Sequence, residues 1–138
     1  MNRTLRIAGP TAAVILAAGL LSAPAASATG NEGPQCVNAL IASNNYNNAA
    51  IGADQSGNAA TAASYDGSTG SNLSAAALAC YYTPSYTAYQ DVLQAETDNN
   101  NAKSANQGGN TSAGLSDEQA AGSLINTAMN IEMGYGYL

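Results

Sequence analysis

The side chains in this chain that could do chemistry are nine carboxylates, eight tyrosines and two cysteines, because histidine is absent. Without histidine the chain lacks the commonest general base, the Ser-His-Asp and Cys-His arrangements and nearly all zinc sites. Carboxylates are then the remaining groups for acid–base work. The composition predicts a protein that is not an enzyme and that uses no cofactor.

The carboxylates show no spacing typical of a catalytic pair. Asp91 and Glu96 are five residues apart and do not share a helix face well, whereas adjacent Asp117 and Glu118 are typical of a helix start. A glycosidase also needs aromatic platforms around its carboxyl pair, and the chain has neither Trp nor Phe. We therefore expect no catalytic residues.

A metal site is not expected either. The run from Asp54 through Ser56 to Asn58 places oxygen side chains at alternate positions, as a calcium-binding loop begins. The sixth position is Ala59, where such a loop needs glycine, and the twelfth is Tyr65, where it needs a bidentate Glu. The segment is better interpreted as a solvated loop.

The two cysteines, Cys36 and Cys80, predict one disulfide. An even pair in a small exported chain is most often bonded, and a loop of this length should stabilise the fold by roughly 3–4 kcal/mol. The alternative is a pair of reactive thiols, which would need neighbouring cations to lower their pKa. No histidine is present to provide one.

The N-terminus is typical of a secretory signal peptide. Arg3 and Arg6 precede an apolar run over 12–21, and Ala26, Ser27 and Ala28 form a small-x-small cleavage site. The alternative, a membrane anchor, would need a longer apolar run. We expect cleavage of 1–28, leaving 29–138 as a single small mature domain that is secreted.

The predicted mature chain is acidic, with Lys103 as its one cation against nine carboxylates and a net charge of −8. It has no basic patch for nucleic-acid phosphates or for an anionic membrane surface. We expect no nucleic-acid partner and no integral membrane segment after cleavage. A protein partner is the remaining class, and self-association is also open.

The pattern of alanine, apolar residues and capping signals predicts an all-α fold, a small helical bundle of about four to five short helices with one disulfide. The predicted helices span 34–43, 49–64, 72–82, 84–98 and 116–133. Runs rich in Asn, Gly or Ser interrupt them at 44–48 and 66–71, and 98–114 is predicted to be a long flexible loop. Two helix starts are predicted from their capping signals, Thr83-Pro84 and the capping box Ser116–Gln119.

The densest apolar segment, 73–96, is predicted to be a helical hairpin at the centre of the core. It holds four tyrosines that take the place of the missing Phe and Trp: Tyr81, Tyr82, Tyr86 and Tyr89. The other aromatic segment is the 134–138 tail, in which glycines precede Tyr135 and Tyr137 and the chain continues to Leu138. Tyrosine supplies contact area at low entropic cost, so this tail is the predicted binding segment.

Two fragments, Gln55-Ser56-Gly57-Asn58-Ala59-Ala60 and Gln107-Gly108-Gly109-Asn110, suggest an alternative. Each resembles part of the Gln-x-Gly-…-Asn-x-Ala repeat of curlin-type bacterial surface fibres, and the first is similar to a short stretch of the rodlins. The resemblance implies a β-rich, fibre-forming subunit. The two fragments cover about ten residues, and no period of ~20–23 residues links them.

The sequence thus favours a secreted, non-enzymatic binding or structural protein, such as a subunit of an extracellular complex or a protein-directed ligand or inhibitor. One alternative is the self-assembling cell-surface fibre subunit. Another is a membrane-active secreted toxin, against which the acidic charge argues.

Overall fold

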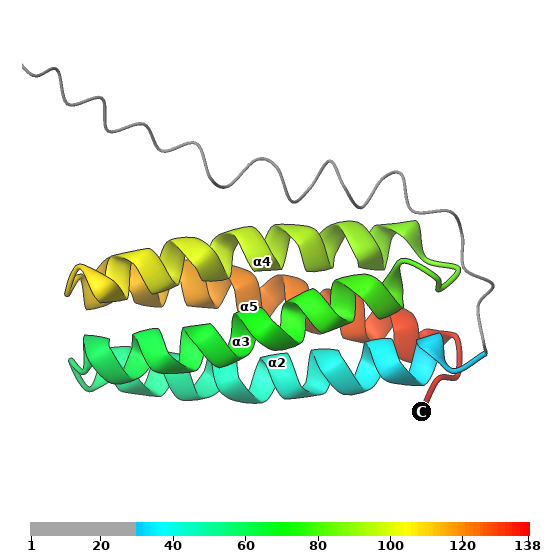
Figure 1. Cartoon of the computed structure of the whole chain (residues 1–138), viewed down its shortest axis with the longest axis horizontal. Coiled ribbons are helices and arrows are strands. Elements are labelled where there is room, and N and C mark those ends of the chain that lie inside the picture. The colour runs from blue at the N-terminus through cyan, green and yellow to red at the C-terminus, as the bar shows by residue number, and fades with distance from the viewer. Residues whose placement is uncertain (1–29) are drawn as a thin grey trace, which may run out of the picture.

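The described part of the chain folds into an antiparallel bundle of four long helices. The computed structural model describes residues 30–138, and the predicted signal peptide lies outside the described residues. Each helix packs on the next along the chain, and α2 also packs on α5, which closes the bundle (Figure 1). The predicted all-α bundle is confirmed, with longer helices than expected. The helices are α2 (Glu32–Gln55), α3 (Ala59–Cys80), α4 (Tyr86–Gln107) and α5 (Thr111–Gly134).

The two turns at one end of the bundle have the same construction. Gly57 and Gly109 end α2 and α4 with φ of +74° and +79°, a conformation that favours glycine. Asn58 then donates its backbone N–H to the Ala53 carbonyl, and Asn110 donates to Ala105 in the same way. The two asparagine side chains also accept N-capping bonds from the next helix. Each turn therefore reverses the chain within three residues.

These turns are the two Gln-x-Gly-Asn fragments that resemble a fibre repeat. The sequence around them repeats at an offset of 52 residues, and 47–58 and 99–110 share seven of twelve residues. Residues 30–138 contain no strand, so the β-rich alternative is wrong for this part of the chain. The fragments resemble each other because each closes one helical hairpin, and residues 30–138 consist of two similar hairpins.

Three segments predicted to be non-helical lie within helices. Residues 44–48 are in α2 and 66–71 are in α3, while 98–114 is the end of α4, a three-residue turn and the start of α5. The prediction of a flexible 98–114 loop is therefore wrong. Asn47, Asp66 and Asn99 are fully buried in these segments, where they bond across the bundle instead of competing for their own backbone.

Two predicted helix starts are displaced. Ser85, not Thr83, caps α4, because its hydroxyl accepts a bond from the Ala88 N–H. Asn110 caps α5, and the predicted capping residue Ser116 lies inside that helix. The capping-box prediction was wrong because the Gly109-Asn110 turn starts α5 at Thr111, before Ser116 is reached.

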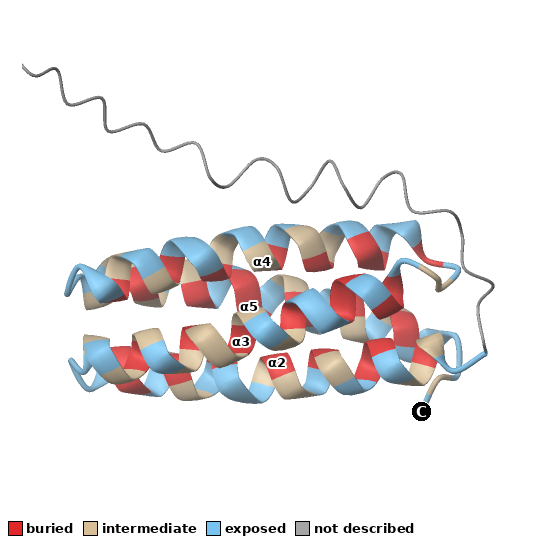
Figure 2. Cartoon of the chain, in the orientation of Figure 1, coloured by how far each residue is buried: buried red, intermediate tan, exposed pale blue. Residues whose placement is uncertain are grey.

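The apolar core occupies the end of the bundle opposite the two turns. Its fully buried apolar side chains include Leu40, Leu73, Val92 and Ile125, one from each helix. The predicted disulfide is confirmed: it joins Cys36 in the first turns of α2 to Cys80 at the end of α3. Figure 2 shows the buried residues along the inward faces of the helices.

The four tyrosines of 73–96 are less buried than predicted. Tyr89 is 7% exposed and belongs to the core, but Tyr81 and Tyr86 are 40% and 70% exposed. Buried alanines at the same level, such as Ala76 and Ala88, let the helices approach too closely for four tyrosine rings. Within 30–138, no helix is long and apolar enough to cross a membrane.

Candidate functional site

Tyrosines gather at the end of the bundle that holds the disulfide. Tyr81 packs its ring edge-on against both Tyr82 and Tyr89, with ring centroids 5.1 Å and 5.3 Å apart. Tyr86 lies 6.1 Å from Tyr89, so one chain of ring contacts covers the connection between α3 and α4. Edge-to-face contacts of this kind stabilise the positions of the rings. We call this surface, with Tyr135, Tyr137 and Leu138, the tyrosine end.

The C-terminal tail lies at the same end and is held against α2. The ring of Tyr137 occupies the space that a side chain at Gly33 would need, so glycine allows the tail to lie on the first turn of α2. The ring of Tyr135 is tilted against that of Tyr137, with centroids 6.2 Å apart, and Tyr135 remains 52% exposed. Leu138 is 68% exposed. The predicted binding residues therefore lie on a packed tail, with Tyr135 and Leu138 facing solvent.

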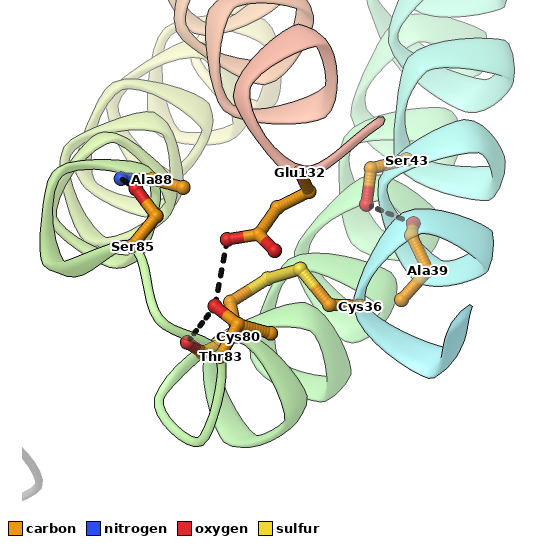
Figure 3. Close-up of a disulfide and its surroundings, with 8 residues drawn as sticks. All are labelled: Cys36, Ala39, Ser43, Cys80, Thr83, Ser85, Ala88 and Glu132. Atoms are coloured by element: carbon orange, nitrogen blue, oxygen red, sulfur yellow. Dashed lines mark hydrogen bonds between the residues drawn. A yellow bond between two sulfur atoms is a disulfide. The ribbon is translucent and has the colours of Figure 1, made fainter. Parts of the chain in front are cut away.

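A buried acid lies beneath the tyrosine end. Glu132 of α5 points toward the α3–α4 connection, where its Oε1 is 2.6 Å from the Thr83 hydroxyl (Figure 3). That hydroxyl is also 2.8 Å from the Cys80 carbonyl, and it has one proton to donate. Burial raises the pKa of Glu132. The hydrogen bond that Thr83 donates acts in the opposite direction and lowers that pKa, but burial outweighs it.

The second unusual site is a group of buried polar side chains toward the two turns, which we call the polar core. It contains three carboxyls and three amides contributed by all four helices, each at most 5% exposed. Its members are Asn47 and Asp54 from α2, Asp66 from α3, Asn99 and Asn106 from α4, and Glu118 from α5.

The amides of the polar core bond between the two hairpins. Asn47 donates to the backbone carbonyl of Glu118, and Asn99 donates to that of Asp66, each at 3.0 Å. The two bonds are equivalent under the 52-residue repeat. Gly122 and Gly70 permit them, because a Cβ there would lie 2.8 Å and 3.1 Å from the respective amide nitrogens. The polar core therefore joins the hairpins by a repeated pair of bonds.

The carboxyls of the polar core have too few donors. Asn106 donates to both Asp66 and Glu118 at 3.0 Å, whereas both carboxyl oxygens of Asp54 lack a donor. Burial and the nearby acids Asp66 and Asp54 raise the pKa of Glu118 to about 8. Burial also raises the pKa of Asp66, against the lowering effect of the Asn106 bond and Lys103. A buried carboxyl with a raised pKa keeps its proton at neutral pH.

The sequence predicted the disulfide, which is confirmed, but missed the polar core; binding by the aromatic tail stays a prediction. The Asp54-x-Ser56-x-Asn58 run does not converge on one point, because Asp54 is buried, Ser56 lies in the turn and Asn58 caps α3. Among residues 30–138, no group of three or more His, Cys, Asp or Glu is arranged to hold a metal ion. The signal that could have revealed the polar core is the pairing of Asn47 with Asn99 and Gly70 with Gly122 at the same offset.

Comparisons of the chain with protein-family models, curated proteins and solved structures found no match.

Proposed function

We propose that the protein is a secreted, non-enzymatic binding protein whose contact surface is the tyrosine end. The observation that carries the proposal is the exposure of Tyr86, Tyr135 and Leu138, at 70%, 52% and 68%, on one end of a rigid helical frame. Tyrosine is among the residues most enriched where binding energy concentrates in protein interfaces. Aromatic side chains on a fixed frame also lose little conformational entropy on binding.

Three features support a rigid contact surface. The disulfide joins α2 to α3 beneath the tyrosines, the rings contact each other, and the tail is docked on α2 through Tyr137 and Gly33. The surface around them has no basic cluster, since Lys103 is the one cation in 30–138 and lies in α4, toward the turns. A protein partner with an apolar or basic surface fits this chemistry better than nucleic acid.

Export is part of the same proposal. The signal-peptide pattern of 1–28 directs the chain out of the cell, and disulfides form and persist in oxidising compartments. N-terminal sequencing of protein purified from the culture medium is expected to start at Thr29. Recovery of the unprocessed chain from the cell interior would contradict export.

The binding surface is tested by site-specific photo-crosslinking in the producing culture. A photoreactive phenylalanine analogue in place of Tyr86 is expected to form a discrete adduct, which mass spectrometry identifies. The matched control is the same analogue at Tyr46, a tyrosine of α2 with similar chemistry and 41% exposure away from this end. Excess wild-type protein should compete for the adduct, and a Tyr86→Ser, Tyr135→Ser variant should not.

The outcomes of this experiment separate the candidate functions. An adduct with another secreted protein supports the binding function, and an adduct with a second copy would indicate a self-associating structural subunit. Equal crosslinking at Tyr46 and Tyr86 would contradict a contact surface at the tyrosine end.

A further inference from the structure

Buried carboxyl groups in the polar core are not explained by a binding function at the opposite end. Asp54, Asp66 and Glu118 come from three helices and are 5%, 0% and 0% exposed. A buried carboxylate is costly unless hydrogen bonds or opposite charges compensate for the loss of water. The protonation state of these three carboxyls therefore decides how the cluster is stabilised.

The hydrogen-bond donors present are insufficient for three ionised carboxylates. Both amide hydrogens of Asn106 are used, one by Asp66 and one by Glu118. The amides of Asn47 and Asn99 donate to backbone carbonyls instead. No donor in 30–138 reaches either oxygen of Asp54.

A proton on Glu118 corrects this imbalance. The Asp54 and Glu118 side chains are close enough to form a hydrogen bond once one of them is protonated, and Asp54 acts on Glu118 both through that bond and as a like charge. Two ionised carboxylates have no hydrogen to share, whereas a protonated Glu118 donates to Asp54. Asp66 of α3 also lies within hydrogen-bonding reach of Glu118, but it already accepts from Asn106 of α4, whereas Asp54 accepts from no donor. Lys103 of α4 acts on Asp66.

We propose that Glu118 and Asp54 share a proton across the α2–α5 contact, and that this proton acts as a latch that holds the turn end of the bundle closed. Loss of the proton in alkali places adjacent negative charges in the core and separates the hairpins at that end. The disulfide holds the other end of the first hairpin, and Leu40, Leu73 and Ile125 pack the two hairpins together there.

The composition of the turn end makes it sensitive to such a change. Its buried apolar side chains are small, being Ala50, Ala53, Ala62 and Ala102, and Gly114 leaves room for Asp54 and Asn106. Small side chains bury little area, so little apolar packing opposes the separation. A polar groove of about 250 Å³ lies between α3 and α4 and borders the cluster at Asp66, with Glu96 and Lys103 also in its lining.

The first test follows the carboxyl of Glu118 by carbon NMR in the wild-type protein as pH is raised. We expect a titration midpoint near pH 8, consistent with the pKa of about 8 that burial and the nearby acids Asp66 and Asp54 produce. A Glu118 midpoint within the ordinary range of 4 to 5 would overturn the proposal, because the carboxyl would then be ionised at neutral pH. This measurement needs no variant.

The second test compares melting temperatures between pH 6 and pH 9. Wild-type protein is expected to lose melting temperature as pH rises, and Glu118→Gln should flatten the curve, since glutamine keeps the size and supplies an N–H to Asp54. Asp117→Asn, which removes a carboxyl of the same helix outside the cluster, is expected to follow the wild type. A Glu118→Gln curve parallel to the wild type would overturn the proposal.

The same experiment distinguishes a proton from a cation. Calcium chloride at pH 9 is expected to leave the wild-type melting temperature unchanged relative to the same ionic strength of sodium chloride. A rise in melting temperature that calcium produces in the wild type and not in Glu118→Gln would overturn the shared-proton proposal, because a cation would then fill the cluster.

Discussion

The two ends of this bundle belong to the same helices and the same hairpin repeat, but their interiors differ: the disulfide end is apolar apart from the buried acid Glu132, and the turn end is polar. Toward the disulfide, the side chains that meet at the centre are Leu40, Leu73, Val92 and Ile125. Toward the turns, the equivalent layers are filled by asparagines and acids, with Asn47 and Asn99 in matching positions. The first interior is stabilised by burial of apolar area, whereas the second depends on amide hydrogen bonds between the hairpins and on how its carboxyls are protonated.

We therefore expect the two ends to differ in how strongly their stability depends on pH. Apolar packing depends weakly on pH, whereas a buried carboxyl changes its interaction with the fold when it ionises. The exposed tyrosines lie at the apolar, disulfide-linked end, so the proposed contact surface is separated from the proposed latch. The following predictions test this division, from the largest expected effect to the smallest.

Removal of the disulfide should have the largest effect. Replacing both Cys36 and Cys80 by serine frees a loop closed at a sequence separation of 44, which should lower the free energy of unfolding by about 4 kcal/mol. Urea unfolding followed by circular dichroism measures the change. A loss below about 1 kcal/mol would show that the apolar end does not depend on the covalent link.

Truncation of a core side chain should come next. Leu73→Ala removes a fully buried side chain at the apolar end and should cost about 3 kcal/mol in unfolding free energy, with no change in the pH dependence of stability. Thermal unfolding at pH 6 and at pH 9 provides both values. If Leu73→Ala altered the pH dependence of stability as strongly as Glu118→Gln, the two ends would not contribute independently to the free energy of unfolding.

Blocking one bond between the hairpins should have a smaller effect. A methyl at Gly122 would lie 2.8 Å from the Asn47 amide nitrogen, so Gly122→Ala should displace Asn47 and cost about 2 kcal/mol. Gly52→Ala is the matched control, because nothing lies within 4 Å of its new methyl and alanine favours a helix. Denaturant midpoints of the two variants should therefore move in opposite directions.

Glu132 should give the smallest effect, as a single carboxyl. Its pKa is raised by burial, so its contribution to stability is full below the ordinary carboxyl pKa and is lost as pH rises through the raised value. Glu132→Gln should remove at most about 1.4 kcal/mol of this loss per pH unit. Denaturant titrations across the pH range measure the slope. An unchanged slope would mean that Glu132 is ionised throughout.

The sequence was sufficient for the parts of the fold that follow from local chemistry. The all-helical class followed from alanine content and apolar spacing, and the Cys36–Cys80 disulfide followed from an even pair. The helix boundaries did not follow, because Asn47 and Asp66 are poor helix residues by local preference and are stabilised here by bonds to other helices. A preference scale contains no information about those distant partners.

The polar core could not be predicted from residue types one at a time. Glu118 was interpreted as a charge near a helix start, which is its commonest role, whereas it lies two turns inside α5 and is fully buried. Comparison of the chain with itself at an offset of 52 residues would have aligned Asn47 with Asn99 and Asp66 with Glu118. Polar residues that recur at equivalent positions of the two hairpins are expected to face each other in the interior of the bundle.

Residue-resolved amide hydrogen exchange at pH 6 and pH 9, corrected for intrinsic rates, tests the division of the bundle most directly. We predict that protection is lost at pH 9 around Asp54 and Glu118, and retained around Leu40 and Ile125. A Glu118→Gln variant should keep protection at both ends. Uniform loss of protection along all four helices, or no loss near Glu118, would contradict the account.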